Sequence, residues 1–337
     1  MVVVRVGFLS LAHMHAYSYG RALNSLSNCI LVGIYDPNQE RGTKGAQAMN
    51  TQFFSDPEKL LTQVDAVIIC SENNRHREFT ELAAQYGCHV LCEKPIATTM
   101  EDGQAMIDAC QKAEVKLQIA FPVRFATPVR QVKTMLDRGY IGEVVAISGT
   151  NHGQMPGGWF VNPVLAGGGA VMDHTVHVVD LVRWFLGQEF VSVYAEAGYG
   201  MLWDVDIDDC GMLSMELEGG TIVTQDPSWS RPRTNPTWGD VTLRIVGTKG
   251  IIDLDAYAQN FVVYDDAQNK VSQRSFAEDM DLGLIVDFIA MITDDREPSI
   301  TGFDGLKAME VALAAYESAR AHKPIALNRQ RQGSEYY

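Results

Sequence analysis

The sequence has little positive charge and few cysteines. Its 27 lysines and arginines stand against 42 aspartates and glutamates, a formal net charge of −15 over 337 residues. A surface this negative repels nucleic-acid phosphates and anionic lipid, so we expect neither nucleic acid nor a membrane as a partner. None of the six cysteines forms a CxxC pair, so a zinc ribbon or a thioredoxin-like motif is not indicated. Several lie in apolar runs, which is typical of buried free thiols in a reducing compartment.

The sequence also lacks a long hydrophobic run and a cleavable leader pattern. No apolar stretch reaches the roughly 20 residues of a membrane span, and the N-terminus begins as a strand. We therefore expect a cytoplasmic protein. Apolar residues make up 46% of the chain, which is enough for two hydrophobic cores in about two domains.

Strands and helices alternate through the first part of the chain, which predicts an α/β, doubly wound parallel sheet in residues 1–122. This is the Rossmann arrangement, in which ligands bind outside the carboxyl ends of the strands. We expect strands at 2–9, 30–35, 51–54, 66–70, 88–92 and 116–120, and helices at 13–26, 39–49, 74–86 and 100–113, with a short helix starting at 55–58.

Glycine is missing from the first turn, where a dinucleotide-binding fold usually has G-x-G-x-x-G. Here the pattern is Ser10-x-Ala12-x-x-His15. Small side chains at the first two positions still let a pyrophosphate approach the backbone, and the helix N-terminus still attracts an anion. We take Ser10, Ala12, His13 and Met14 as cofactor-binding candidates, although the histidines are also ordinary residues for a first helical turn. A metal site at His13 and His15 is not expected, since residues two apart on a helix do not face each other.

Asp36 ends the second strand, where a carboxylate accepts hydrogen bonds from the adenosine ribose. It repels a 2′-phosphate, so it favours NAD over NADP, while Arg41 leaves NADP open. The other reading of Asp36 is a residue of an Asp-Pro turn.

The tripeptide Glu93-Lys94-Pro95 stops the apolar strand at 88–92. Proline cannot donate a hydrogen bond and keeps Lys94 out of helical geometry, so the strand ends here. Glu93 and Lys94 therefore lie at the ligand-binding edge of the sheet, unless Lys94 is only a solvated lysine.

The pattern of strands and helices in residues 123–337 predicts an α+β domain with one broad, mostly antiparallel sheet flanked by helices. We expect strands near 144–149, 191–197, 211–218, 221–225, 241–247, 251–255 and 260–264, and helices near 171–185, 282–294 and 303–321.

Several motifs in this order resemble those of the Gfo/Idh/MocA oxidoreductases: an Asn-x-x-His turn at 73–76, Glu-Lys-Pro at 93–95, an Arg-Phe junction at 121–125, a helix-to-strand turn at 138–144, a catalytic-helix pattern at 167–180 and a last helix at 304–324. The chain departs from the family in its glycine-free turn and in Glu72, where the family usually has proline. The resemblance implies a nicotinamide cofactor and a homodimer or homotetramer formed through the second sheet. It adds Ser71, Glu72, Asn73, His76, Glu93 and Lys94 to the cofactor-binding candidates.

Asp173 and His177 lie one helical turn apart and share a face, which Asp180 extends. Because this polar stripe follows Gly167-Gly168-Gly169, we expect the helix to open onto a cleft, although a solvated or N-capping cluster is the alternative. For alcohol oxidation, His177 suits the general base and Lys94 stabilises the alkoxide. Asp173 orients the hydroxyl or holds the other two groups.

The substrate-contact candidates are Lys94, Arg124, His152, Trp159, Asp173, His174 and His177. A metal held by Asp173, His174, His177 and His152 is the alternative use of the same residues, and we predict no metal.

Together these features predict an NAD(P)-dependent dehydrogenase or reductase of a sugar, a sugar derivative or an inositol-like cyclic polyol. Two other functions remain open at this point. One is an NAD-dependent glycosidase or lyase that recycles its bound oxidant, and the other is a non-catalytic, cofactor-binding regulator.

Overall fold

The computed structural model describes residues 3–258, 260–265, 270–275 and 278–327. The chain forms two compact units. The first unit contains Met1–Phe125, Asn162–Gly167 and Glu278–Met309, and the second contains the remaining residues. Val2, at the start of the strand expected at 2–9, lies outside the described residues. So do residues 328–337, at the end of the second predicted domain.

The first unit is built on a six-stranded parallel sheet in the order β3-β2-β1-β4-β5-β6. The order reverses between β1 and β4, which is the switch point where such folds bind ligands. The predicted doubly wound parallel sheet is therefore confirmed. Its strands are β1 (Val4–Leu9), β2 (Cys29–Tyr35), β3 (Gln52–Phe54), β4 (Ala66–Ile69), β5 (His89–Glu93) and β6 (Leu117–Ala120).

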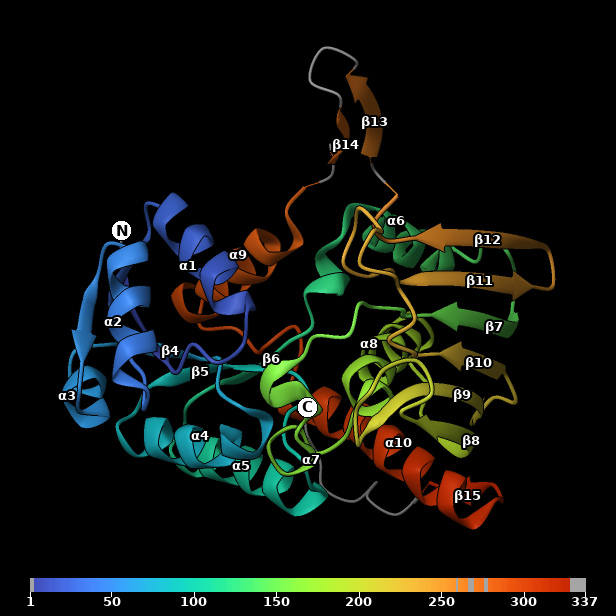
Figure 1. Cartoon of the computed structure of the whole chain (residues 1–337), viewed down its shortest axis with the longest axis horizontal. Helices are drawn as coiled ribbons and strands as arrows, with labels where there is room; N and C mark the ends of the chain where they lie inside the picture. The colour runs from blue at the N-terminus through green and yellow to red at the C-terminus, as the bar shows by residue number, and fades with distance from the viewer. Residues whose placement is uncertain (1–2, 259, 266–269, 276–277, 328–337) are drawn as a thin grey trace. The chain divides into compact units, whose positions relative to one another are not determined.

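Helices cover both faces of this sheet (Figure 1), so its central strands are apolar on both sides. α4 packs with α5 on one face, and α1 packs with α9 on the other. The helices of the unit are α1 (His15–Ser25), α2 (Gln39–Ala48), α3 (Pro57–Leu61), α4 (His76–Gln85), α5 (Met100–Lys112), α7 (Pro163–Ala166) and α9 (Met280–Thr293), with short 3-10 turns η1 (Asn73–Arg75) and η2 (Pro122–Phe125).

The second unit contains a seven-stranded sheet in the order β12-β11-β7-β10-β9-β8-β15. All its strand pairs are antiparallel except β7 with β10, so the mostly antiparallel sheet is confirmed. Its strands are β7 (Val144–Thr150), β8 (Phe190–Tyr199), β9 (Asp208–Leu217), β10 (Ile222–Asp226), β11 (Thr242–Gly247), β12 (Gly250–Asp255) and β15 (Ile325–Ala326).

The segment at 260–264, which we expected in this sheet, lies elsewhere. Among the described strands, β13 (Asn260–Asp265) pairs only with β14 (Lys270–Ser275), in a separate two-stranded sheet. An isolated strand pattern fixes the strand but not its partner, and this partner was not expected from the sequence.

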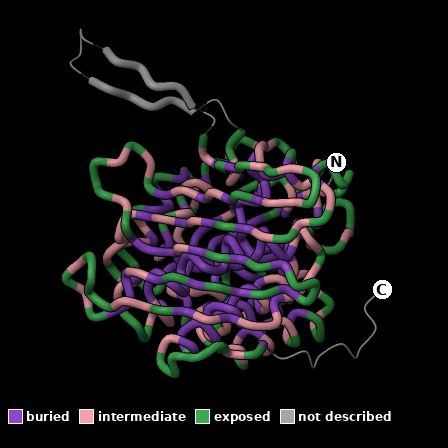
Figure 2. Tube along the Cα trace, turned by 90° about the vertical axis from the view of Figure 1, so that its right-hand side faces the viewer, coloured by how far each residue is buried: buried purple, intermediate pink, exposed green. Residues whose placement is uncertain are grey.

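One face of the seven-stranded sheet is exposed, and the other packs on helices. Buried and exposed residues alternate along β9 and β10, as Figure 2 shows for this side of the molecule. α8 (Ala170–Leu186) packs against β9 and β10, and α6 (Thr127–Asp137) packs against β12 and α8. The other helical elements are η3 (Gly158–Val161) and α10 (Gly302–Ala321), whose residues to Met309 belong to the first unit.

Fifteen of the 17 residues of α8 are buried. A helix buried on almost every side is a core helix, so the polar residues that α8 carries are unusual. None of the described helices is long and apolar enough to cross a membrane.

Candidate functional site

The turn after β1 explains how the chain manages without glycine. Ser10 has a φ of 69°, the left-handed conformation that glycine favours. Its hydroxyl accepts a hydrogen bond from the Ala12 N–H at 3.3 Å, and its own N–H donates to the Tyr35 carbonyl at 2.7 Å. Serine thus keeps the turn, although its Cβ adds strain of about 1–2 kcal/mol.

The α1 N-terminus that follows this turn fits an anionic group such as a dinucleotide phosphate. The first turn of α1 contains no acidic residue, and Met14 at the N-cap makes no side-chain cap. His13 accepts the first two N–H groups of α1, from His15 at its Nδ1 and from Ala16 at its carbonyl, each at 3.2 Å, so the helix dipole is what favours negative charge here. This is the fit expected of the pyrophosphate-binding turn of the fold.

Asp36 is buried at the end of β2 and is held by several donors. Its carboxylate accepts from the Leu11 and Asn38 N–H groups, each at 2.7 Å. Arg41 donates to both of its oxygens, at 2.8 and 2.9 Å. The carboxylate that disfavours a 2′-phosphate and the guanidinium that would accept one are thus a direct ion pair.

The structure brings His13 and His15 together at Glu93, contrary to expectation. Nδ1 of His15 lies 3.0 Å and Nδ1 of His13 lies 3.6 Å from Oε1 of Glu93. The expectation that the two histidines point apart is wrong, because His13 precedes the helix, which begins at His15. Its Nδ1 accepts the His15 N–H at 3.2 Å. Within the described residues, these three form the one group of His, Cys, Asp or Glu whose ligand atoms all lie within 4.8 Å of one another.

Glu93 is a buried anion at the end of β5. Burial raises the pKa of its carboxyl, but His13, His15 and Lys94 outweigh burial and hold that pKa well below its usual range. Burial likewise lowers the pKa of His15, and Glu93 more than offsets this, so the pKa of His15 is raised. Glu93 thus favours the protonated form of the His15 imidazole, 3.0 Å away.

Lys94 follows Glu93 and is only 4% exposed. Its N–H donates to Oε2 of Glu93 at 3.1 Å, and the Lys94–Pro95 peptide bond is cis. His76, one of the cofactor candidates, is the first residue of α4 and reaches this turn: its Nδ1 is 3.0 Å from the Pro95 carbonyl. Because a carbonyl only accepts, this nitrogen carries the proton. His76 thus holds the turn that presents Lys94.

The remaining cofactor candidates follow β4. Ser71 is fully buried, and its hydroxyl donates to the Glu72 carbonyl at 3.0 Å. Glu72 lies 3.7 Å from Arg41, so it joins the Asp36–Arg41 pair. The Asn73 side-chain amide donates to the Ala166 carbonyl at 2.9 Å. These residues surround the carboxyl ends of β1, β2 and β4, together with the first turn.

In the second unit, the N-terminus of α8 is capped by the protein itself. Asp208 accepts the Gly169 and Val171 N–H groups, each at 2.8 Å. The Tyr316 hydroxyl donates to Asp208 at 2.8 Å and accepts the Met172 N–H at 3.0 Å. A carboxylate from β9 therefore occupies the N–H groups of this helix end. The cleft expected beside the helix stays a prediction.

Asp173 and His174 on α8 are buried and are oriented by the segment after β10. The Trp229 indole donates to Oδ2 of Asp173 at 3.2 Å, and Nε2 of His174 lies 3.3 Å from the same oxygen. Nδ1 of His174 lies 2.9 Å from the Pro227 carbonyl and so carries a proton. His177, one turn further along, is 8% exposed. Asp173 and His177 thus lie on the same helix, one turn apart as predicted, and both are buried.

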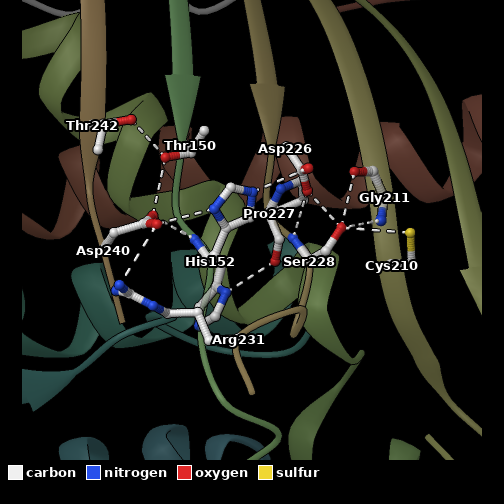
Figure 3. A network of polar contacts seen from close by, with 11 residues as sticks. Thr150, His152, Cys210, Gly211, Asp226, Pro227, Ser228, Arg231, Asp240 and Thr242 are labelled. Atoms are coloured by element: carbon white, nitrogen blue, oxygen red, sulfur yellow. Dashed lines mark hydrogen bonds and ion pairs between the residues drawn. The ribbon is translucent and has the colours of Figure 1, made fainter. Parts of the chain in front are cut away.

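His152 lies in the loop after β7, between two aspartates (Figure 3). Its Nε2 is 3.1 Å from Asp226, its Nδ1 is 3.0 Å from Asp240, and its N–H donates to Asp240 at 2.8 Å. The hydrogen bonds that the imidazole donates to both aspartates raise the pKa of His152 to about 9. It is an imidazolium at neutral pH, with both ring nitrogens engaged by the protein.

The last two substrate candidates lie in different units. Arg124 is buried in the first unit, where it donates to the Ser299 carbonyl at 3.1 Å and lies 3.6 Å from Asp304. Trp159 is in the second unit and stacks on Phe160 with ring centroids 3.9 Å apart.

Sequence reasoning missed Asp208, Trp229 and Tyr316, which hold the start of α8, and the two aspartates that hold His152. Only weak signals point to them. Asp208 and Asp209 are two charged residues at the start of a strand that then alternates, and Trp229 lies in a Pro-Ser-Trp segment directly after β10. Their partners are distant in sequence, so no local pattern identifies them.

The chain matches two family models. An "Oxidoreductase family, NAD-binding Rossmann fold" model covers residues 2–121, and a "GFO/IDH/MocA C-terminal domain" model covers residues 129–253.

Individual proteins resemble it over half to nearly all of its length. A myo-inositol 2-dehydrogenase of Thermotoga maritima is 26% identical over 96% of this chain and 98% of its own. A D-glucoside 3-dehydrogenase of Escherichia coli is 36% identical over 54% of this chain and 57% of its own. The crystal structure of GenD2 from gentamicin A biosynthesis, in complex with NAD, matches 97% of each chain with a TM-score of 0.88 and 21% identity.

Proposed function

The chain belongs to the GFO/IDH/MocA family of oxidoreductases, and from that premise we propose that it transfers a hydride between a nicotinamide cofactor and a secondary alcohol of a sugar, a sugar derivative or an inositol-like polyol. The names of its relatives support this substrate class, since they include an inositol and a glucoside dehydrogenase. We assign the dinucleotide to residues 1–122 and the substrate to residues 123–337.

Three side chains carry the proposed chemistry. His177 takes the hydroxyl proton during oxidation, because imidazole titrates near neutral pH. Lys94 stabilises the negative charge that develops on the same oxygen. Asp173 positions the hydroxyl and the neighbouring groups. The nicotinamide supplies the hydride acceptor.

The observation that carries the proposal is the placement of Lys94. It directly follows β5, at the carboxyl edge of a parallel sheet where this fold binds its ligands. A lysine that is only 4% exposed is rare unless it has a function or a partner. Glu93 and His76 hold the backbone on either side of it. A solvated, strand-capping lysine would need none of these features.

NAD is the proposed cofactor, with NADP as the alternative. Asp36 supports NAD because a carboxylate repels a 2′-phosphate. The proposed contacts are Ser10, Ala12, His13, Met14, Asp36, Ser71, Glu72, Asn73, His76, Glu93 and Lys94. Arg124, His152, Trp159 and His174 remain proposed substrate-site residues, and no metal is proposed.

We also propose a homodimer or homotetramer that forms through the exposed face of the seven-stranded sheet. Met212, Ile222 and Ile251 support this assignment: each is more than half exposed, and all three point to the outer face. Covering such residues is a usual reason for association.

The proposal is tested by measuring NAD and NADP binding, and then following nicotinamide reduction with a panel of inositols, free sugars and methyl glucosides. We expect saturable binding and net reduction with at least one polyol or sugar. Glycoside cleavage without net reduction would instead show a recycled oxidant. Binding without any turnover across the panel, unaffected by Lys94→Ala, would point to a regulator.

A further inference from the structure

A short segment of the second unit connects His152 to α8. This segment, Asp226–Trp229, follows β10 directly. Its first residue accepts from the His152 imidazole, and its last donates from its indole to Asp173. Between them, the Pro227 carbonyl faces His174. Each end of the segment thus meets a different titratable group.

Trp229 has little freedom to move within this segment. It is fully buried, its N–H donates to the Asp209 carbonyl at 2.9 Å, and its carbonyl accepts the Trp203 indole N–H at 2.7 Å. Its own indole N–H is 3.2 Å from Asp173. The position of this indole therefore follows the path of the backbone from Asp226 onward.

His152 joins that backbone to the neighbouring strands. Asp226 and Asp240 come from the end of β10 and from the residues just before β11, and the imidazole lies between them (Figure 3). Thr150 donates to Asp240 at 3.0 Å, and Ser228 donates to Asp226 at 2.5 Å. Without a cation between them, the two carboxylates would repel each other.

We propose that His152 is a positioning residue: as an imidazolium between Asp226 and Asp240 it fixes the segment Asp226–Trp229, and through Trp229 and Pro227 this segment orients Asp173 and His174. The inference rests on the proposed function, in which Asp173 acts in catalysis. It gives His152 an indirect role that does not depend on contact with the substrate.

The proposal has a definite pH dependence. In the described part of the chain, the charged groups facing the imidazole are Asp226, Asp240 and Arg231, whose guanidinium lies 3.9 Å from Asp240. The pKa of His152 is raised to about 9 by its two aspartates. A raised pKa means that the clamp is complete below the ordinary histidine value of about 6.5 and is lost as pH rises through about 9.

The test follows His152 and Trp229 by NMR in the whole enzyme. The imidazole nitrogens of His152 are titrated in ¹⁵N-histidine-labelled protein, and the Trp229 indole N–H is assigned by its loss in Trp229→Phe. We expect the Trp229 resonance to move with the same midpoint as His152, near pH 9. The Asp240→Asn variant removes one of the two charges and should lower both midpoints together by about one pH unit.

His152→Gln removes the charge but keeps a polar side chain. At pH 7 we expect a shifted Trp229 resonance, and a kcat reduced roughly 10- to 100-fold with a smaller change in KM, on whichever polyol or sugar the substrate panel identifies. His322→Gln is the matched control, since His322 is 74% exposed and lies 3.8 Å from Glu196 in the same unit. It should change neither the spectrum nor kcat.

The proposal would be overturned if the chemical shift of the Trp229 indole changed neither with the titration of His152 nor in the Asp240→Asn variant. An unchanged kcat in a folded His152→Gln enzyme that turns over the substrate normally would also overturn it, and that result would leave the proposed function standing. If His152→Gln does not fold, the wild-type titration and Asp240→Asn decide. If no sugar or polyol is oxidised, the proposed function fails while the spectra still test the coupling.

Discussion

Ser10 adopts a backbone conformation that usually requires glycine, at the turn that receives the dinucleotide phosphates in this family. The strain is offset locally by the hydrogen bond that its hydroxyl accepts from Ala12. The cost of burying a carboxylate is likewise offset by a neighbouring side chain at Asp36, which pairs with Arg41, and at Glu93, which lies beside two histidines. In the first unit, polar side chains thus stabilise a turn that glycine usually forms and charges that water usually solvates.

Replacing Ser10 tests that reading of the turn. Ser10→Ala keeps the Cβ in left-handed backbone and loses the hydrogen bond to Ala12, whereas Ser10→Gly removes the strain. We expect Ser10→Ala to be less stable than Ser10→Gly by about 1 kcal/mol in the free energy of unfolding. Urea unfolding of both variants beside the wild type provides the comparison. An alanine variant as stable as the glycine variant would show that the turn carries no strain.

Asp36 and Arg41 decide the cofactor preference in our account. Asp36→Ala should lower the ratio of NAD to NADP affinity by roughly tenfold or more, because it removes a charge-assisted acceptor for the ribose and a repulsion of the 2′-phosphate. Arg41→Ala should raise that ratio, since it leaves Asp36 free of its ion-pair partner. Fluorescence titration with both reduced cofactors measures it. Equal ratios in all three proteins would remove Asp36 from the account.

Among the elements, α8 is the one on which the second unit depends. It is buried almost throughout, and it carries Asp173, His174 and His177. Asp208 and Tyr316 cap its first turn, and the Cβ of any residue at 169 would lie 1.9 Å from the Asp208 carbonyl oxygen. The last glycine of Gly167-Gly168-Gly169 is therefore needed for close packing. Its φ is −95°, so a left-handed backbone is not the reason for glycine here.

A pair of glycine variants at the two ends of α8 tests this packing. Gly169→Ala forces a backbone clash and should lower the free energy of unfolding by about 2 kcal/mol or more. Gly187→Ala adds a methyl group where no atom lies within 4 Å, so it should cost only the left-handed strain of about 1 kcal/mol. Thermal and urea unfolding measure both. Equal losses would mean that Asp208 does not close the start of the helix.

Local pattern was enough to predict the helix α8 and the spacing of Asp173 and His177, because both follow from helical periodicity. It could not predict that Asp208 would cap the helix, since that residue lies 39 positions from Gly169 and belongs to another element. The prediction that His13 and His15 point apart was wrong because the helix begins at His15. The geometry of two residues within one helix therefore does not apply to them. β13 was predicted as a strand, but its partner β14 was not. A contact between distant segments thus explains the first difference, and the exact start of a helix and the choice of strand partner explain the other two.

At the scale of the whole molecule, a parallel sheet and a mostly antiparallel sheet divide the proposed work between cofactor and substrate. The sequence motifs were sufficient for this architecture because each strand and turn of the first unit carries a local signal. The outer face of the second sheet is exposed along β9, β10 and β12. We propose that a second copy of the chain covers it.

Charge on that face should prevent the proposed association. Ile222→Glu places a carboxylate at the centre of the sheet face, and burying it in an interface is costly. We expect light scattering to find an oligomer for the wild type and a smaller species for this variant. Val164→Glu is the matched control, because Val164 is 73% exposed on α7, an element of the first unit. A monomeric wild type, or an unaffected Ile222→Glu, would contradict the assignment.

The central claim is that Lys94 acts on the reacting alcohol of a nicotinamide-dependent reaction. The most direct measurement compares kcat and cofactor affinity for Lys94→Ala with those for Lys112→Ala, an exposed lysine at the end of α5. The account predicts a folded Lys94→Ala enzyme that still binds the cofactor but whose kcat falls roughly 100-fold or more, while Lys112→Ala behaves as the wild type. A Lys94→Ala enzyme that turns over at the wild-type rate would contradict it.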